Sequence, residues 1–187
     1  MALGATVYRF LVTLSDVDRG VYESLDVRVA RHPSESARYL LTRTLGYCLS
    51  YEEGIVFSKG GISSTDEPPI AIRDATGVLR TWIEIGSPSA ERLHKAAKAA
   101  PKVELYTCAE LGSLRREAAT RPVHRLEEIV VQRFDPGFID ALDAKVEKNT
   151  SFELVRNSGE LYVSVAGSTL DSALTTASLC EVAAEAR

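Results

Sequence analysis

Residues 79–100, LRTWIEIGSPSAERLHKAAKAA, constrain the fold most because they join a strand to an amphipathic helix through a tight turn. Alternating apolar residues over 79–85 predict the strand, and Gly86 ends it. Leucine and alanine then recur at helical spacing, which predicts a helix with Ser87 as its N-cap and Pro88 at its first position. A strand that feeds a helix is typical of an α/β sheet, in which functional sites gather at the carboxyl ends of strands.

Glu84 is the residue of this strand whose surroundings decide its role. It stands between two isoleucines, two positions after Trp82, the only tryptophan of the chain. In a central strand both faces are covered, and a covered carboxylate needs a cation, a metal ion or hydrogen-bond donors. In a half-exposed strand the same side chain points to water. The sequence is compatible with both alternatives.

Composition and charge bound the class of protein. The 187 residues suffice for one sizeable domain, with 45% apolar residues, 26% charged residues and a net charge of −4. A net acidic chain argues against non-specific coating of nucleic acid but is compatible with a local basic groove. No run is long and apolar enough to cross a bilayer, and the three cysteines form no CxxC pair. We therefore expect a cytoplasmic protein with free thiols and no membrane contact.

The rest of the chain predicts a mixed α/β protein. Residues 5–14 and 21–30 predict an antiparallel hairpin, and a helix capped by Ser34 follows. From this helix to the strand at 103–107 the predicted order is α-β-β-β-α-β. Weaker patterns predict a helix at 111–120, a strand at 126–133, a helix at 136–148, a hairpin of 152–156 with 161–166, and either a last helix or a frayed tail over 172–187. Without a linker or a repeat, we expect one domain over residues 1–187.

Four places carry side chains suited to chemistry. They are an acid at a helix start, an acidic loop, a strand acid and a basic helix face, namely Glu35; Asp66 and Glu67; Glu84; and Lys95 with Arg92 and Lys98. Carboxylates in this order suit a Mg²⁺ or Mn²⁺ pocket for phosphodiester hydrolysis, and a lysine beside it would position water or stabilise phosphoryl charge. Each place also has a structural interpretation. Glu35 would match the helix dipole, the loop acids would be solvated, and Lys95 would form a surface pair with Glu91.

Five blocks of sequence carry a resemblance to a known family. They are ALGATVYRF near the start, ARHPSES at 30–36, FSKGGISSTDEPP at 57–69, WIEIGSP at 82–88, and the helix with Arg92 and Lys95. Together these blocks resemble the YaeQ family of bacterial proteins. That family is similar in fold to the PD-(D/E)XK nuclease superfamily. The resemblance implies a restriction-endonuclease-like α-β-β-β-α-β core with additional N-terminal and C-terminal strands.

The resemblance also implies roles for individual residues. Glu35 matches the helix acid of the superfamily, and Glu84 matches the acid of its E-x-K element. Gly86 stands where that element has a lysine. The YaeQ family supplies a lysine from the following helix instead, and the resemblance implies that Lys95 is this lysine here.

One departure from the superfamily pattern concerns the acidic loop. The aspartate that follows proline in the superfamily is Pro69 here. Proline can neither ligate a metal through its side chain nor donate a backbone hydrogen bond. Either Asp66 or Glu67 completes a metal site with Glu84, or that site is weakened or lost.

The first of three hypotheses is a divalent-metal-dependent, nuclease-like phosphodiesterase. Its catalytic residues would be Glu35, Glu84 and Lys95. Its metal ligands would be Glu84, Asp66 and Glu67. A local basic groove would contact the phosphates of nucleic acid through four residues, Arg92, His94, Lys98 and Lys102.

The second hypothesis is a non-catalytic module that keeps the nuclease fold and binds nucleic acid or protein. The acidic net charge and Pro69 favour it. The third is a purely structural site in which Glu84 forms a buried ion pair with Lys95 or Arg31 and binds no ligand. The substrate, the partner and the oligomeric state stay open.

Overall fold

A computed structural model describes residues 4–58 and 66–184 of the protein. Secondary structure in this part of the chain is a mixture of helices and strands in two mixed sheets, which confirms the predicted mixed α/β class. None of the described helices has the length and apolar character that a membrane crossing requires.

The chain gathers into two compact units, each built from two separate stretches. Unit 1 consists of Met1–Tyr51 with Phe134–Leu174, and unit 2 of Glu52–Arg133 with Thr175–Arg187. Each unit holds one sheet with its helices. The single domain expected over residues 1–187 stays a prediction.

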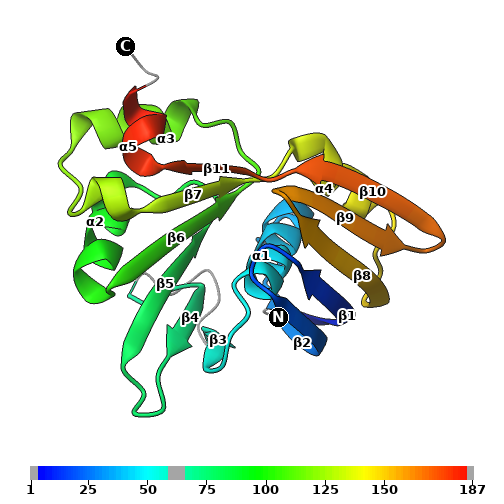
Figure 1. Ribbon diagram of the computed structural model, residues 1–187. Helices are drawn as coiled ribbons and strands as arrows, with labels where there is room; N and C mark the ends of the chain where they lie inside the picture. The colour runs from blue at the N-terminus through cyan, green and yellow to red at the C-terminus, as the bar shows by residue number, and fades with distance from the viewer. Residues whose placement is uncertain (1–3, 59–65, 185–187) are drawn as a thin grey trace. The chain divides into compact units, whose positions relative to one another are not determined.

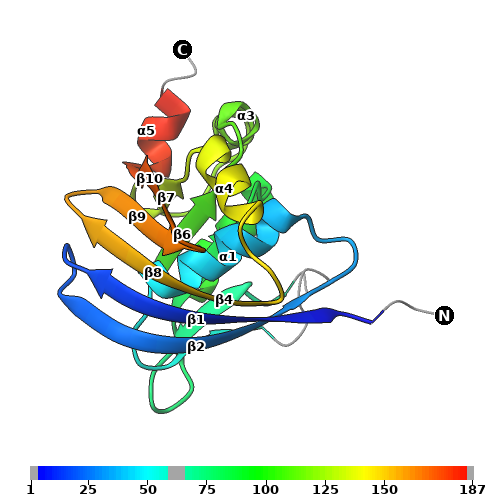
Figure 2. The same cartoon turned by 90° about the vertical axis from the view of Figure 1, so that its right-hand side faces the viewer.

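Unit 1 is a five-stranded sheet in the order β10-β9-β8-β1-β2 (Figure 1). The bounds of its strands are β1 Thr6–Asp16, β2 Val21–Arg31, β8 Asn149–Asn157, β9 Glu160–Val165 and β10 Ser168–Ala173. β1 and β8 are parallel, and the other neighbours are antiparallel. The helices α1 (Ala37–Leu49) and α4 (Pro136–Asp143) lie side by side against this sheet (Figure 2).

Alternation of apolar and polar residues explains why the N-terminal hairpin packs on one face. In β1, Phe10, Val12 and Leu14 are buried while the residues between them are exposed. β2 alternates in the same way, so one face of the hairpin joins the core and the other is open. The predicted hairpin is confirmed, with strands longer than the sequence suggested.

Unit 2 is a six-stranded sheet in the order β11-β7-β6-β5-β4-β3. The bounds are β3 Ile55–Phe57, β4 Ile70–Arg73, β5 Leu79–Ile85, β6 Lys102–Thr107, β7 Val130–Arg133 and β11 Thr175–Ser178. Strands β5, β6 and β7 are parallel, and the outer pairings are antiparallel. Its helices are α2 Ala90–Ala99, α3 Gly112–Thr120 and α5 Leu179–Ala184, with a 3-10 turn η2 at Leu126–Glu128.

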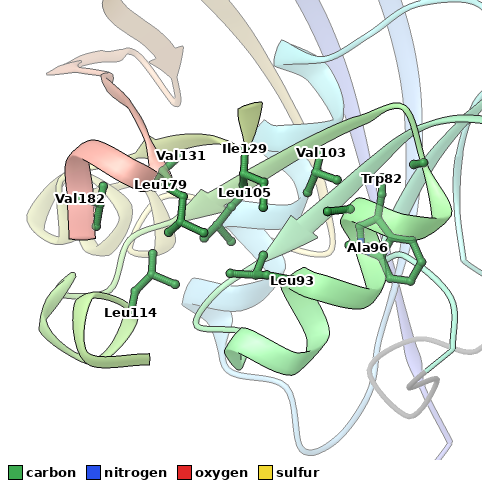
Figure 3. Packing of buried hydrophobic residues seen from close by; sticks show 12 residues of the cluster. Trp82, Leu93, Ala96, Val103, Leu105, Leu114, Ile129, Val131, Leu179 and Val182 are labelled. Atoms are coloured by element: carbon green, nitrogen blue, oxygen red, sulfur yellow. The ribbon is translucent and has the colours of Figure 1, made fainter. Parts of the chain in front are cut away.

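The core of unit 2 lies between α2, α3, α5 and the central strands. Trp82 and Leu105 come from β5 and β6, Leu93 from α2, and Leu179 and Val182 from the C-terminal helix (Figure 3). All five side chains are almost fully buried. Residues distant in sequence thus close one hydrophobic cluster.

The predicted order α-β-β-β-α-β is confirmed as α1, β3, β4, β5, α2 and β6. Both helices, however, begin two residues later than predicted, with Ser36 and Ser89 as N-caps in place of Ser34 and Ser87. Ser36 and Ser89 each accept a hydrogen bond from the backbone N–H of the third helical residue, which defines them as the caps.

The C-terminal prediction of a last helix or a frayed tail is wrong in its first part. Residues 172–173 end β10, residues 175–178 form β11, and the helix begins only at Leu179. Serine, threonine and alanine give these strands little periodic signal. They are strands because β10 pairs with β9 and β11 pairs with β7.

Candidate functional site

Glu84 lies near the carboxyl end of β5, a strand paired on both sides by β4 and β6. Its side chain is buried, so the central-strand alternative holds. Oε2 accepts hydrogen bonds from Nε of Arg92 at 2.7 Å and from the indole Nε1 of Trp82 at 3.0 Å. Oε1 accepts one from the backbone of Ile85 at 3.3 Å. Both carboxylate oxygens therefore have donors, as a buried carboxylate requires.

Arg92 connects this strand acid to the acidic loop. The Ser89 cap places Arg92 in the first turn of α2, above the end of β5. Its guanidinium lies 5.6 Å from the ring centroid of Trp82, and Nη2 donates to the carbonyl oxygen of Glu67 at 3.0 Å. One arginine therefore pairs with Glu84, stacks on an aromatic ring and holds the loop.

Burial raises the pKa of the Glu84 carboxyl above its ordinary value. The charge of Arg92 and the hydrogen bonds from Trp82 and Arg92 act in the opposite direction and offset part of this effect. At the carboxyl end of β5, burial therefore disfavours the charged form of Glu84, whereas Arg92 stabilises that form.

Lys95 lies one turn further along α2 and forms an ion pair with Asp66. Hydrogen bonding and charge from Lys95 hold the pKa of Asp66 below its usual range. The expected surface pair between Lys95 and Glu91 is wrong, because Glu91 lies 3.6 Å from Arg121 instead. The hypothetical buried pair of Glu84 with Lys95 is wrong as well, because Arg92 is the cation on that carboxylate.

The predicted metal ligands do not fit Mg²⁺ or Mn²⁺ in this arrangement. Glu84 and Asp66 are each paired with their own cation, and Glu67 offers its backbone oxygen to Arg92. Over residues 4–58 and 66–184 no three histidine, cysteine or acidic side chains gather as a metal site would need. The metal itself stays a prediction.

Glu35 belongs to unit 1 and precedes the N-cap of α1, so its placement in the first helical turn is wrong. Its buried carboxylate lies 3.0 Å from Nη2 of Arg43 and accepts the amide hydrogen of His32 at 3.2 Å. The same Nη2 donates to the carbonyl oxygen of Ala30 at 2.7 Å. Burial raises the pKa of Glu35, and Arg43 lowers it in part. That Glu35 acts together with Glu84 stays a prediction.

The predicted phosphate contacts have mixed surroundings. Lys102 is 2.6 Å from Glu104, and Arg92 is engaged with Glu84. His94 accepts the amide hydrogen of His124 at 3.2 Å. Lys98 is exposed in the last turn of α2. Two of the four predicted contacts are therefore neutralised by acids of the chain itself.

Sequence reasoning missed two residues that complete these sites. From the sequence alone Trp82 had no assigned role in the site, yet its indole N–H donates a hydrogen bond to the carboxylate of Glu84. Arg43 was not noticed, although it stands eight residues after Glu35, and Arg92 likewise stands eight residues after Glu84. An acid before a capped helix and an arginine eight positions later was the signal available for both pairs.

The protein is of the mixed α/β class, with helices and two sheets. It has a charged internal site, formed by a buried acid and its arginine partner at the end of a central strand. The family model described as YaeQ protein matches residues 1–174. The chain therefore belongs to the YaeQ family.

Relatives and solved structures agree with this assignment. The YaeQ protein of Salmonella typhi is 27% identical over 176 residues, which cover 94% of this chain and 97% of the relative. That of Escherichia coli K12 is 35% identical over 107 residues, covering 57% of this chain and 59% of the relative. The names of these relatives state no activity.

Two crystal structures of YaeQ proteins share the fold. The protein from Pseudomonas syringae has a TM-score of 0.83 at 26% identity, covering 92% of this chain and 95% of that structure. The protein from Xanthomonas axonopodis pv. citri also has a TM-score of 0.83 at 26% identity, covering 93% and 98%. The likeness extends over both units.

Proposed function

We propose that this chain is a non-catalytic interaction module, for nucleic acid or protein, that keeps a PD-(D/E)XK-like core. The order of α1, β3, β4, β5, α2 and β6 supports this core, because it is the order that the family resemblance implies. Glu84 at the end of the third of these strands and Lys95 on the next helix further support it, because the resemblance implies an acid and a lysine at these two positions. Gly86 stands where the E-x-K element has its own lysine.

The observation that carries the proposal is the guanidinium of Arg92 on the carboxylate of Glu84, at 2.7 Å. A divalent cation needs anionic oxygens with room for itself and its water ligands. Here the Oε2 atom of Glu84 is shared between Arg92 and Trp82, and the motif aspartate is replaced by Pro69. Interaction without metal-dependent hydrolysis is the function that this arrangement favours.

A second candidate is the divalent-metal-dependent, nuclease-like phosphodiesterase. It is favoured by the position of the loop acids. Arg92 and Lys95, on successive turns of α2, hold the carbonyl of Glu67 and the carboxylate of Asp66, so these acids lie beside the helix that also meets Glu84. This candidate requires that Arg92 leave Glu84 and pair with phosphoryl oxygens.

Calorimetric titration with Mn²⁺ and Mg²⁺ separates the two candidates. We expect no saturable binding by the native protein, nor by Glu84→Gln. Asp171→Asn, which alters an exposed carboxylate on β10, is the matched control for non-specific charge effects. Saturable binding by the native protein and by Asp171→Asn that disappears in Glu84→Gln would overturn the proposal and favour the phosphodiesterase.

A binding assay in EDTA tests the interaction directly. Labelled single-stranded and double-stranded oligonucleotides, followed by fluorescence anisotropy, should bind without being cleaved if the partner is nucleic acid. Cleavage that depends on Mg²⁺ and on Glu84 would contradict the non-catalytic proposal. Absence of any oligonucleotide binding would direct the same proposal to a protein partner.

A further inference from the structure

Unit 1 contains a small pocket that takes no part in the site around Glu84. It has a volume of about 240 Å³, and its lining includes Thr6, Tyr8, Arg31, His32 and Lys148. These residues come from the start of β1, from the end of β2 and the position directly after it, and from the position directly before β8. Among the described residues of the lining, every ionisable group that carries charge near neutral pH is basic, and none is an acid.

Arg31 is held in place at the pocket by two hydrogen bonds. Its Nε donates to the carbonyl oxygen of Glu35 at 3.0 Å, and its Nη1 lies 3.3 Å from the hydroxyl of Tyr8. These bonds use two of the three guanidinium nitrogens and fix the plane of the group. Nη2 has no hydrogen-bond partner among the described residues, so a preorganised donor remains for a ligand.

The hydrogen bonds of His32 define which ring nitrogen can donate to a ligand. The backbone N–H of Ser34 donates to Nδ1 of His32 at 3.2 Å, and the Ser34 hydroxyl lies 2.6 Å from the same atom. Because Nδ1 accepts the amide hydrogen, this network assigns the proton of the neutral ring to Nε2. Nε2–H is therefore a donor in either protonation state of the ring.

Lys148 adds an exposed positive charge to this pocket. Its backbone carbonyl accepts the amide hydrogen of Arg9 at 2.7 Å, which fixes the chain beside β1, while its side chain is exposed. Its ammonium forms no ion pair with the described acids. The carboxylate of Glu35 pairs with Arg43 at 3.0 Å and also interacts electrostatically with His32 and Arg31. Arg43 offsets part of this negative charge, and with Lys148 the lining stays basic.

We propose that this pocket binds the phosphate group of a phosphate monoester. A guanidinium, an imidazole N–H, an ammonium and two hydroxyls are the donors that a phosphate dianion needs, and arginine pairs with phosphate in a fixed geometry. The volume of about 240 Å³ is below the ~300–1,000 Å³ of pockets for drug-sized ligands, so it suits a phosphate with part of the group that carries it. The inference does not rest on the proposed function, because no residue of the Glu84 site lines the pocket.

The test is calorimetric titration of the full chain with inorganic phosphate at low ionic strength. We expect one saturable site that Lys148→Gln and His32→Gln each weaken about tenfold, as loss of one charge-assisted hydrogen bond predicts. Arg116→Gln removes one positive charge from an exposed residue of α3 that does not line the pocket, and it should leave the affinity unchanged. Circular dichroism of each variant checks its folding, and Arg31→Lys is the milder variant at the residue that also supports Tyr8.

Two oligonucleotides of one sequence, with a 5′-phosphate or a 5′-hydroxyl, distinguish the source of the phosphate. Tighter binding of the 5′-phosphorylated strand, weakened by Lys148→Gln, would assign the pocket to nucleic-acid ends. Equal binding of the two strands, with the phosphate site retained, would assign it to small phosphate monoesters. Absence of saturable phosphate binding, or equal weakening by Lys148→Gln and Arg116→Gln, would overturn the inference.

Discussion

The two buried acid–arginine pairs, Glu35–Arg43 in unit 1 and Glu84–Arg92 in unit 2, share their chemistry but differ in their surroundings. In both, an arginine nitrogen lies within 3.0 Å of a buried carboxylate oxygen, and burial raises the pKa of the carboxyl group. The Arg43 side chain is only 3% exposed, whereas that of Arg92 is 22% exposed. The first pair is closed off from water and the second can be approached from it.

The donors around each carboxylate differ in the same sense. Both oxygens of Glu84 accept hydrogen bonds, from Trp82, Ile85 and Arg92. In Glu35, the Oε1 atom is buried and accepts none from the described residues. Glu35 therefore depends more on its arginine than Glu84 does. The comparison indicates a structural pair in unit 1 and a pair in unit 2 that a ligand could open.

Arg43→Met should have the largest effect on stability. It leaves the buried carboxylate of Glu35 without its cation, and removing one partner of a buried pair costs about 3–5 kcal/mol. Urea denaturation should show this loss in the free energy of unfolding. The double variant Arg43→Met with Glu35→Gln should recover most of it. If the single variant costs less than the double variant, the pair is not the reason for the burial of these side chains.

Arg92→Met should cost less, about 1–3 kcal/mol, because water reaches the pair and two donors stay on Glu84. Arg121→Met, at an exposed pair with Glu91, is the control and should be close to neutral. The same denaturation assay, followed by fluorescence of Trp82, reports both stability and the loss of the arginine from the indole face. A cost equal to that of Arg43→Met would remove the distinction between the two pairs.

The pH dependence of stability should reveal the raised pKa of each buried acid. A carboxyl whose folded pKa exceeds its unfolded value near 4.5 contributes stability below that pH and loses it as the pH rises through the folded pKa. Glu84→Gln does not titrate here, so the native protein should lose stability relative to this variant as the pH rises from about 4.5. Glu35→Gln gives the same comparison in unit 1. The opposite slope would mean that the arginine outweighs burial.

Much of the fold could be predicted because its strands and helices carry periodic signals. The N-terminal hairpin, β5 and α2 all show them, and their order is confirmed. β10 and β11 were missed because their small and hydroxyl-bearing residues are specified by pairing with β9 and β7, which lie elsewhere in the sequence. Local pattern cannot report a strand that only its neighbours stabilise.

The candidate site was predicted in composition but not in pairing. Glu84, Asp66, Arg92 and Lys95 were singled out, and the structure brings them together around α2. The later start of α2 leaves its buried face unchanged, because Leu93, Ala96 and Ala97 are buried as their helical spacing predicted. Which cation meets which acid is instead decided by contacts between β5, α2 and the acidic loop, which are separate in the sequence. A local pattern does not report such contacts, so the pairing could not be predicted.

Breaking the Lys95–Asp66 pair should have the smallest effect. Their side chains are 47% and 81% exposed, and exposed pairs of this kind contribute little to stability, less still at high salt. Lys95→Met and Asp66→Asn should therefore each change the free energy of unfolding only slightly, and raising the salt concentration should erase the difference from the native protein. An effect as large as that of Arg92→Met would mean that the acidic loop is anchored through Lys95, and that unit 2 closes its charged site with two cations of α2 instead of one.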